Sequence, residues 1–257
     1  QQHRALFTLP PIKVSASTAV AVPELPPQQT VTGDKEIDAV LWLHQVIKTG
    51  QATLIEKAMK AAARIKTPLK EVEKRYAAYL AKAYPGNFGA MLSSFGFADL
   101  EDMASRAVAK LARQQEARAR FDDVFADTPA EHFCADTLRG MKLKKGEFFL
   151  NEKQVDSRFA KHPELLPNTL ADCLHELTYW NELYSLRNAL DGYGDGPQEA
   201  TARDWFAFRR LALIRPRSTE EAVAVFRYMS TSDRMEMGES EAILLNLLGG
   251  RAGNETL

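Results

Sequence analysis

The sequence has little of what marks secreted or membrane proteins. Only two of its 257 residues are cysteines, too few for a disulfide framework, so we expect a protein of the reducing cytoplasm. No apolar run approaches the roughly 20 residues that a membrane-spanning helix needs, and we recognise no signal peptide. These absences exclude a disulfide scaffold and an integral membrane protein, and no membrane partner is expected.

The short motifs of common catalytic sites are also missing. The chain contains no G-x-S-x-G, no H-E-x-x-H, no phosphate-binding G-x-x-x-x-G-K-[ST] loop and no G-x-G-x-x-G after a strand. The glycine-rich residues 192–196 follow an expected helix and include an aspartate, which would repel phosphate. We therefore predict a non-enzymatic binding protein with no cofactor, and keep an enzyme as the third alternative.

Two histidine–cysteine pairs form the most suggestive metal pattern. His132 and Cys134 make one pair, and Cys173 and His175 make the other; all four side chains are good zinc ligands. Both pairs fall in expected helices, where residues i and i+2 point about 200° apart. Neither pair can then easily hold one ion. We interpret the cysteines as core residues and the histidines as surface residues, and predict no metal site.

Composition is that of an ordinary globular protein. Hydrophobic residues make up 45% of the chain and charged residues 26%, with a formal net charge of −1. This near-neutral total excludes a wholly basic nucleic-acid coat protein but leaves room for a local basic patch.

Helical periodicity runs through the chain from residue 34 onward and predicts an all-α fold, a bundle of about nine to eleven helices. Asp34 stands at one expected helix start. Thr128 with Glu131, and Ser218 with Glu221, have the spacing of capping boxes.

The body divides best into helical domains at residues 34–127 and 128–257, with residues 144–146 as a second candidate boundary. Residues 148–150 are the only clear strand candidate.

Residues 1–33 differ from the body because they are rich in proline and poor in charge. Proline excludes helix interior and favours extended backbone, so we predict an extended arm. Residues 5–14 could add a strand to a neighbouring sheet. Frequent apolar residues indicate that the arm packs on its own body or on a neighbouring subunit. The candidate partner-binding residues are Leu6, Phe7, Leu9 and Ile12.

Residues 53–84 carry the densest positive charge and are predicted to form two helices joined by a very short turn. Thr53 and Glu56 have capping-box spacing, and Thr67 is the expected cap of the second helix, with Pro68 at its first position. Eight basic and three acidic residues lie between Glu56 and Lys82, a local charge of +5.

This hairpin resembles the DNA-binding helix–turn–helix in general form over about twenty residues. The matching positions are Ala62, Ile65, a turn at Lys66 and Thr67, and Val72. The resemblance implies that the second helix enters the major groove of duplex DNA. The candidate nucleic-acid-binding residues are Lys57, Lys60, Arg64, Lys66, Lys70, Lys74 and Arg75. The alternative interpretation is a helical hairpin with a solvated lysine-rich face.

A later stretch joins aromatic and basic residues, with Trp205 and Arg209 as candidate partner-binding residues. The alternative interpretation of this stretch is a core helix with an exposed basic edge.

Two function hypotheses follow from the sequence. The first is a DNA-binding regulator, or an accessory factor of a bacterial mobile element, acting through residues 53–84. The second is a structural or adaptor subunit of a protein assembly or homo-oligomer, docked through the arm and helical faces.

Overall fold

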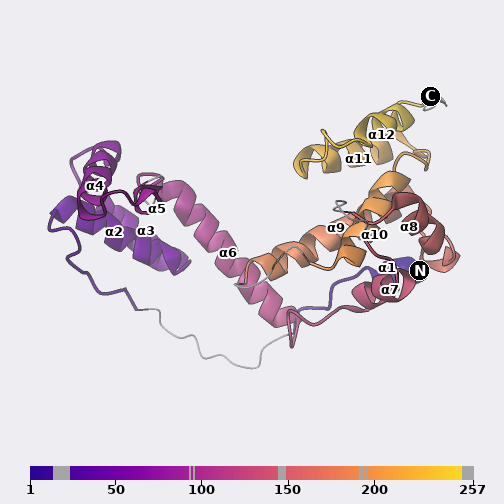
Figure 1. The fold of residues 1–257 in the computed structure, drawn as a ribbon, viewed down its shortest axis with the longest axis horizontal. Coiled ribbons are helices and arrows are strands. Elements are labelled where there is room, and N and C mark those ends of the chain that lie inside the picture. The colour runs from indigo at the N-terminus through magenta and orange to yellow at the C-terminus, as the bar shows by residue number, and fades with distance from the viewer. Residues whose placement is uncertain are drawn as a thin grey trace. The chain divides into compact units, whose positions relative to one another are not determined.

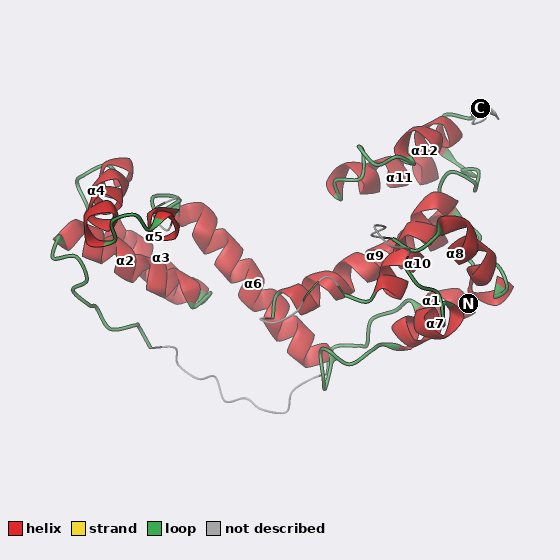
Figure 2. Cartoon of the chain, viewed as in Figure 1, coloured by secondary structure: helices red, strands yellow, loops and turns green. Residues whose placement is uncertain are grey.

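The computed structural model describes residues 1–13, 24–92, 94, 96–143, 149–190, 194 and 196–250, and these contain helices and no strand (Figure 1; Figure 2). The predicted all-α class is confirmed. Ten of the twelve α-helices in these residues are eight residues or longer. The elements are α1 (Gln2–Leu6), α2 (Lys35–Lys48), α3 (Ala52–Ala62), α4 (Leu69–Ala83), α5 (Phe88–Leu92), α6 (Leu100–Arg120), α7 (Pro129–Thr137), α8 (Glu152–Phe159), the 3-10 helix η1 (Pro163–Leu165), α9 (Leu170–Asn188), α10 (Gln198–Arg210), α11 (Thr219–Thr231) and α12 (Ser240–Leu247).

The chain divides into two compact units. Unit 1 contains residues 1–12 and 120–257, and unit 2 contains residues 13–119. The first twelve residues therefore belong to the unit formed by the second half of the chain. The change from unit 2 to unit 1 falls at the last residue of α6, Arg120.

Unit 2 is built on α2, which packs against α3 and α4. Its core joins Val40 and Leu43 of α2 to Leu54 of α3 and Val72 of α4. The predicted cap at Asp34 is confirmed. Its Oδ1 accepts hydrogen bonds from the backbone N–H groups of residues 36 and 37, two of the donors that a helix start leaves open.

Both predicted caps in the basic hairpin are wrong. Helix α3 already begins at Ala52, so Thr53 lies inside the helix and no side chain caps it. Thr67 donates its hydroxyl hydrogen to Glu36 Oε1, 2.9 Å away, and the N-cap of α4 is Pro68. A tertiary hydrogen bond to α2 has replaced the local capping bond expected for Thr67. The connection between α3 and α4 is six residues long, residues 63–68.

Helices α9 and α10 pack side by side at the centre of unit 1. One core cluster joins them to α7 and α8, and a second joins them to α11 and α12. The capping box at Thr128 is confirmed: its Oγ1 accepts from the Glu131 N–H at 3.3 Å, and its own N–H donates to Glu131 Oε2 at 2.7 Å. Ser218 also caps its helix, but the Glu221 carboxylate accepts from the N–H of Arg217 instead.

The arm contains one short helix that the sequence analysis did not predict. Residues 2–6 are helical, so the strand expected over residues 5–14 is wrong at its start, and residues 14–23 lie outside the described part. Residues 7–13 and 24–33 form no helix or strand. The strand candidate at residues 148–150 is also wrong for Phe149 and Leu150, which lie in a loop; Phe148 is outside the described residues.

Candidate functional site

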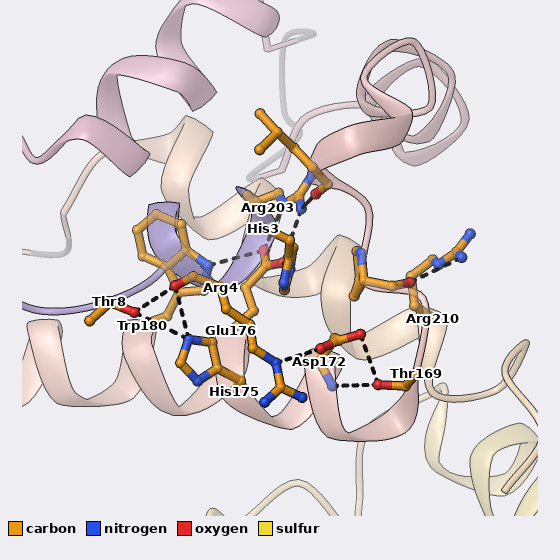
Figure 3. A network of polar contacts seen from close by, with 12 residues as sticks. His3, Arg4, Thr8, Thr169, Asp172, His175, Glu176, Trp180, Arg203 and Arg210 are labelled. Carbon is orange, nitrogen blue, oxygen red and sulfur yellow. Dashed lines mark hydrogen bonds and ion pairs between the residues drawn. The ribbon is translucent and has the colours of Figure 1, made fainter. Parts of the chain in front are cut away.

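Residues 1–12, called the N-terminal segment below, bind to unit 1 through a buried polar contact. Helix α1 packs against α9 and η1. His3 Nε2 lies 2.7 Å from Glu176 Oε2 of α9, and the two residues are only 5% and 0% exposed (Figure 3). A contact so well shielded from water holds one specific segment in one register.

Glu176 is shared between the segment and a buried arginine of α10. Arg203 Nε donates to Glu176 Oε1 at 2.6 Å, and Nη2 donates to Glu176 Oε2 at 3.0 Å (Figure 3). Arg203 Nη2 also donates to the Leu165 carbonyl of η1 at 2.7 Å. Burial raises the pKa of Glu176, but the charge of Arg203 and the hydrogen bonds from His3 and Arg203 outweigh it, so the net pKa is lowered.

Aromatic rings surround the Arg203 guanidinium, and one of them comes from the N-terminal segment. The guanidinium carbon lies 5.0 Å from the ring centre of Phe7. It lies 4.7 Å from that of Phe159 and 4.8 Å from that of Phe206. Phe7 is fully buried and also contacts Trp180 edge-on. The segment therefore completes a cation–π environment around the cation.

Polar contacts at the rim extend the attachment along α9. Arg4 Nε donates to Asp172 Oδ1 at 2.7 Å, and His175 Nε2 lies 3.3 Å from the Arg4 carbonyl oxygen (Figure 3). Further along, Arg120 Nη1 donates to the Pro10 carbonyl at 2.7 Å. Residues 3, 4, 7, 8 and 10 of the segment thus make polar or ring contacts with the rest of unit 1. We call the residues of α9 and α10 that receive them the segment site: Asp172, His175, Glu176, Trp180 and Arg203.

The structure places the predicted partner-binding residues in two separate groups. Leu6 and Leu9 pack, half-buried, against the core cluster that contains Phe7. Ile12 is 56% exposed and takes no part in it. Trp205 and Arg209 line a different hollow of about 660 Å3 on α10.

Sequence reasoning missed the charged residues that hold the site together. His3, Glu176 and Arg203 were not predicted, nor was the second buried ion pair, in which Arg187 Nη1 donates to Glu131 Oε1 at 2.5 Å. A signal was present for α9: Glu176 lies three residues after the buried Cys173, on the apolar face of the helix. A charged residue in that position indicates a buried partner.

The predicted DNA-binding residues of unit 2 mostly have acidic partners. Lys60 pairs with Glu56 at 2.6 Å, and Lys74 pairs with Glu71 at 3.6 Å. Both pairs are exposed and weak, but each places an acidic group beside the lysine, which lowers the net charge that a phosphate would meet.

Two further basic residues contact acids that lie outside the hairpin. Lys70 Nζ lies 3.5 Å from Asp99 Oδ1, and Arg75 pairs with Asp34 at 3.0 Å and Glu36 at 2.5 Å. These three acids were not part of the local +5, so the positive excess at the start of α4 is smaller than the sequence implied.

The remaining basic residues of the prediction gather at α3 and the connection after it. Lys57, Arg64 and Lys66 are exposed, and none has an ion-pair partner among the described residues. This group is where a phosphate backbone would find uncompensated charge.

The described residues do not bring the two histidine–cysteine pairs together. Cys134 and Cys173 belong to different core clusters, and no group of three or more potential metal ligands occurs in the described part of the chain. Burial raises the pKa of both thiols.

None of the helices in the described residues combines the length and the apolar character that crossing a membrane requires.

Comparison with known proteins gives no relative for this chain. No protein-family model matches it. No curated protein and no solved structure matches it significantly.

Proposed function

We propose that this protein is a non-enzymatic assembly subunit whose copies are joined through the N-terminal segment. In the assembly, the segment of one copy binds the segment site of another copy. The observation that supports the proposal is the buried contact between His3 and Glu176, together with Phe7 against Arg203.

The order of the chain supports exchange between copies. Residues 13–171 separate the segment from its site in sequence, and residues 13–119 of this stretch form a unit of their own. The segment is therefore not folded into its site by its sequence neighbours. Exchange of an identical element between copies needs no new surface, because every contact already exists within one copy.

The identity of the partner follows from the fit of the site. Its buried carboxylate takes a histidine at one position and its aromatic wall takes a phenylalanine four positions later. The sequence that meets both requirements is present on every copy of this chain, and a second copy is therefore the partner that we propose.

A mixing experiment with two full-length variants tests this function. Phe7→Ala weakens binding by the segment and leaves the segment site intact. Glu176→Gln weakens the segment site and leaves the segment intact. With a different affinity tag on each chain, we expect the mixture to co-purify and each variant alone to remain monomeric by mass photometry. Ile12→Ala is the matched control, because Ile12 is exposed, and it should associate like the wild type. A wild-type chain that stays monomeric at every concentration, with no association in the mixture, would contradict the proposal.

A second candidate function is DNA binding by unit 2, favoured by the uncompensated charge of Lys57, Arg64 and Lys66. Fluorescence anisotropy with duplex DNA across a salt series is the test, since phosphate contacts make affinity fall steeply as salt rises. Replacing these three residues by alanine should abolish binding. Lys70→Ala with Lys74→Ala, which removes lysines that have acidic partners, should weaken it less. Equal effects of the two variants, or no binding at low salt, would rule this candidate out.

A further inference from the structure

The proline-rich arm is attached at a second place, in unit 2. Residues 26–33, called the arm anchor below, contact α2 and α4. Trp42 Nε1 of α2 donates to the Pro26 carbonyl at 2.8 Å. Tyr79 of α4 donates its hydroxyl hydrogen to the Val31 carbonyl at 3.3 Å. Unit 1 therefore holds the start of the arm, and unit 2 holds its end.

Asp38 of α2 binds the arm anchor most closely. Its Oδ1 accepts from the Thr32 N–H and the Thr32 hydroxyl, both at 2.8 Å. The N–H of Val31 donates to Oδ1 at 3.2 Å, and that of Gly33 donates to Oδ2 at 3.2 Å. Burial raises the pKa of Asp38, but these hydrogen bonds outweigh it, so the net pKa is lowered. Asp38 lies within seven residues of all three N–H groups, so the anchor stays with its own copy when the segment leaves.

The anchor limits how far the segment can reach. Thirteen residues, 13–25, connect the segment to the anchor. A chain spans at most about 3.6 Å per residue, so the connection reaches roughly 50 Å at most. A segment that leaves its own site can then bind only a copy whose segment site lies within that distance of the anchor. Such a short connection holds a segment near the site of an adjoining copy at an effective concentration of roughly millimolar.

Open ends would cost an assembly some of its buried contacts. In a chain of copies joined in one direction, the copy at one end has an empty site, where Glu176 and Arg203 lack His3. The copy at the other end has a free segment that exposes Phe7. A closed assembly has no such ends, and two copies that exchange both segments form the smallest closed assembly. At micromolar protein, a third copy competes poorly with a tethered segment at roughly millimolar concentration.

We propose that the exchange is reciprocal and joins two copies of this chain. Each segment site is then completed by His3 and Phe7 of the other copy, and the same contacts are made twice. The pair rests on the proposed function, exchange of segments between copies, and sets its stoichiometry at two.

Cross-linking of the full chain tests the pair. Thr8 Oγ1 lies 3.5 Å from His175 Nε2 (Figure 3). The double variant Thr8→Cys with His175→Cys therefore places one thiol on the segment and one beside its site, whereas the native cysteines, Cys134 and Cys173, are buried. After treatment with a short bismaleimide at micromolar protein, we expect a denaturing gel to show two joined chains and no larger product. Thr8→Cys alone is the control and should give single chains, because no thiol lies beside the segment site.

The products distinguish the pair from exchange in general. Joined pairs with no larger product would support reciprocal exchange. A ladder of three or more joined chains would keep exchange between copies but overturn the pair. Single chains with only an internal link, at every protein concentration, would overturn both the exchange and the pair. Mass photometry of the wild-type chain needs no substitution, and it should show particles of twice the chain mass and none larger.

Discussion

His3 and Glu176 are 173 residues apart in the chain, yet His3 Nε2 and Glu176 Oε2 lie 2.7 Å apart in a site closed to water. The contact attaches the first residues of the chain to the second half. Since Glu176 also takes two hydrogen bonds from Arg203, the segment contributes to the charge balance of the core as well as to its packing. Removing the segment would take away the contact between His3 and Glu176 and leave the buried ionic network of Glu176 and Arg203 incomplete.

Phe7→Ala tests the apolar half of the attachment. Phe7 is fully buried against Trp180 and Arg203, so the change should lower the free energy of unfolding of unit 1 by about 3–5 kcal/mol, as for other buried Phe→Ala changes. Urea unfolding followed by tryptophan fluorescence measures it. Ile12→Ala, at an exposed position of the same segment, should cost less than about 0.5 kcal/mol. Similar losses for the two variants would mean that Phe7 is not buried.

Glu176→Gln tests the ionic half and its pH dependence. Breaking a buried ion pair from one side leaves Arg203 uncompensated and should cost about 3–5 kcal/mol. Because the folded-state pKa of Glu176 lies below its ordinary value of 4.5, its stabilisation is complete above about pH 4.5 and is lost as pH falls through the folded-state pKa. The variant should therefore lose less stability than the wild type between pH 5 and acid denaturation, as measured by urea midpoints at several pH values.

Glu164→Gln is the control for that experiment, since Glu164 is a half-exposed carboxylate beside His162. It should keep the wild-type pH dependence. If Glu176→Gln loses as much stability on acidification as the wild type, the buried pair of Glu176 and Arg203 does not control the acid sensitivity.

Gly50→Ala should destabilise unit 2 strongly. Gly50 has a φ of +66°, and a Cβ there would lie 2.7 Å from Leu111 Cβ and 2.8 Å from the Ala107 carbonyl oxygen of α6. Gly33 has a similar φ of +81° but open space around its Cβ position. Both alanines carry the backbone penalty of about 1 kcal/mol. A larger loss of thermal stability at residue 50 than at residue 33 reports the close contact with α6, and equal losses would show that the contact is absent.

Thr128→Ala should cost about 1–2 kcal/mol through the lost cap. The hydroxyl accepts from the Glu131 N–H and from the Tyr179 hydroxyl, the latter at 2.8 Å. Thr53→Ala is the informative comparison, because Thr53 has the same local pattern but makes no cap. Thermal unfolding should show a clear loss at residue 128 and almost none at residue 53. The reverse order would mean that the local pattern decides and the structure does not.

The elements of this fold could be predicted from local pattern, because helix propensity, apolar spacing and caps act within a few residues. Asp34 and Thr128 were identified in this way. Thr53 and Thr67 have equally good local patterns and failed. Helix α3 begins one residue before Thr53. The Thr67 hydroxyl donates to Glu36, 31 residues away in sequence, and does not cap α4. Local pattern says that a cap is possible, and tertiary contacts decide whether it forms.

The candidate site could be predicted only in part. The apolar residues of the arm indicated packing, and Phe7 is indeed buried. Nothing local to His3 shows that its partner is Glu176, since pairing across that separation depends on how α9 and α10 present their faces. The charge count of the basic hairpin failed for the same reason: Asp34, Glu36 and Asp99 contact it from outside the counted stretch.

The attachment of the segment is tested most directly by asking whether the segment binds its site as a separate molecule. A labelled peptide of residues 1–13 is titrated into the full-length Phe7→Ala chain, whose own segment is weakened, and anisotropy reports binding. We predict that the wild-type peptide binds the Phe7→Ala chain saturably. It should bind the wild-type chain more weakly, because the site of that chain is occupied. A peptide carrying Phe7→Ala should not bind. Equal binding of the two peptides, or no binding of either to a folded Phe7→Ala chain, would show that the segment does not bind the segment site through Phe7.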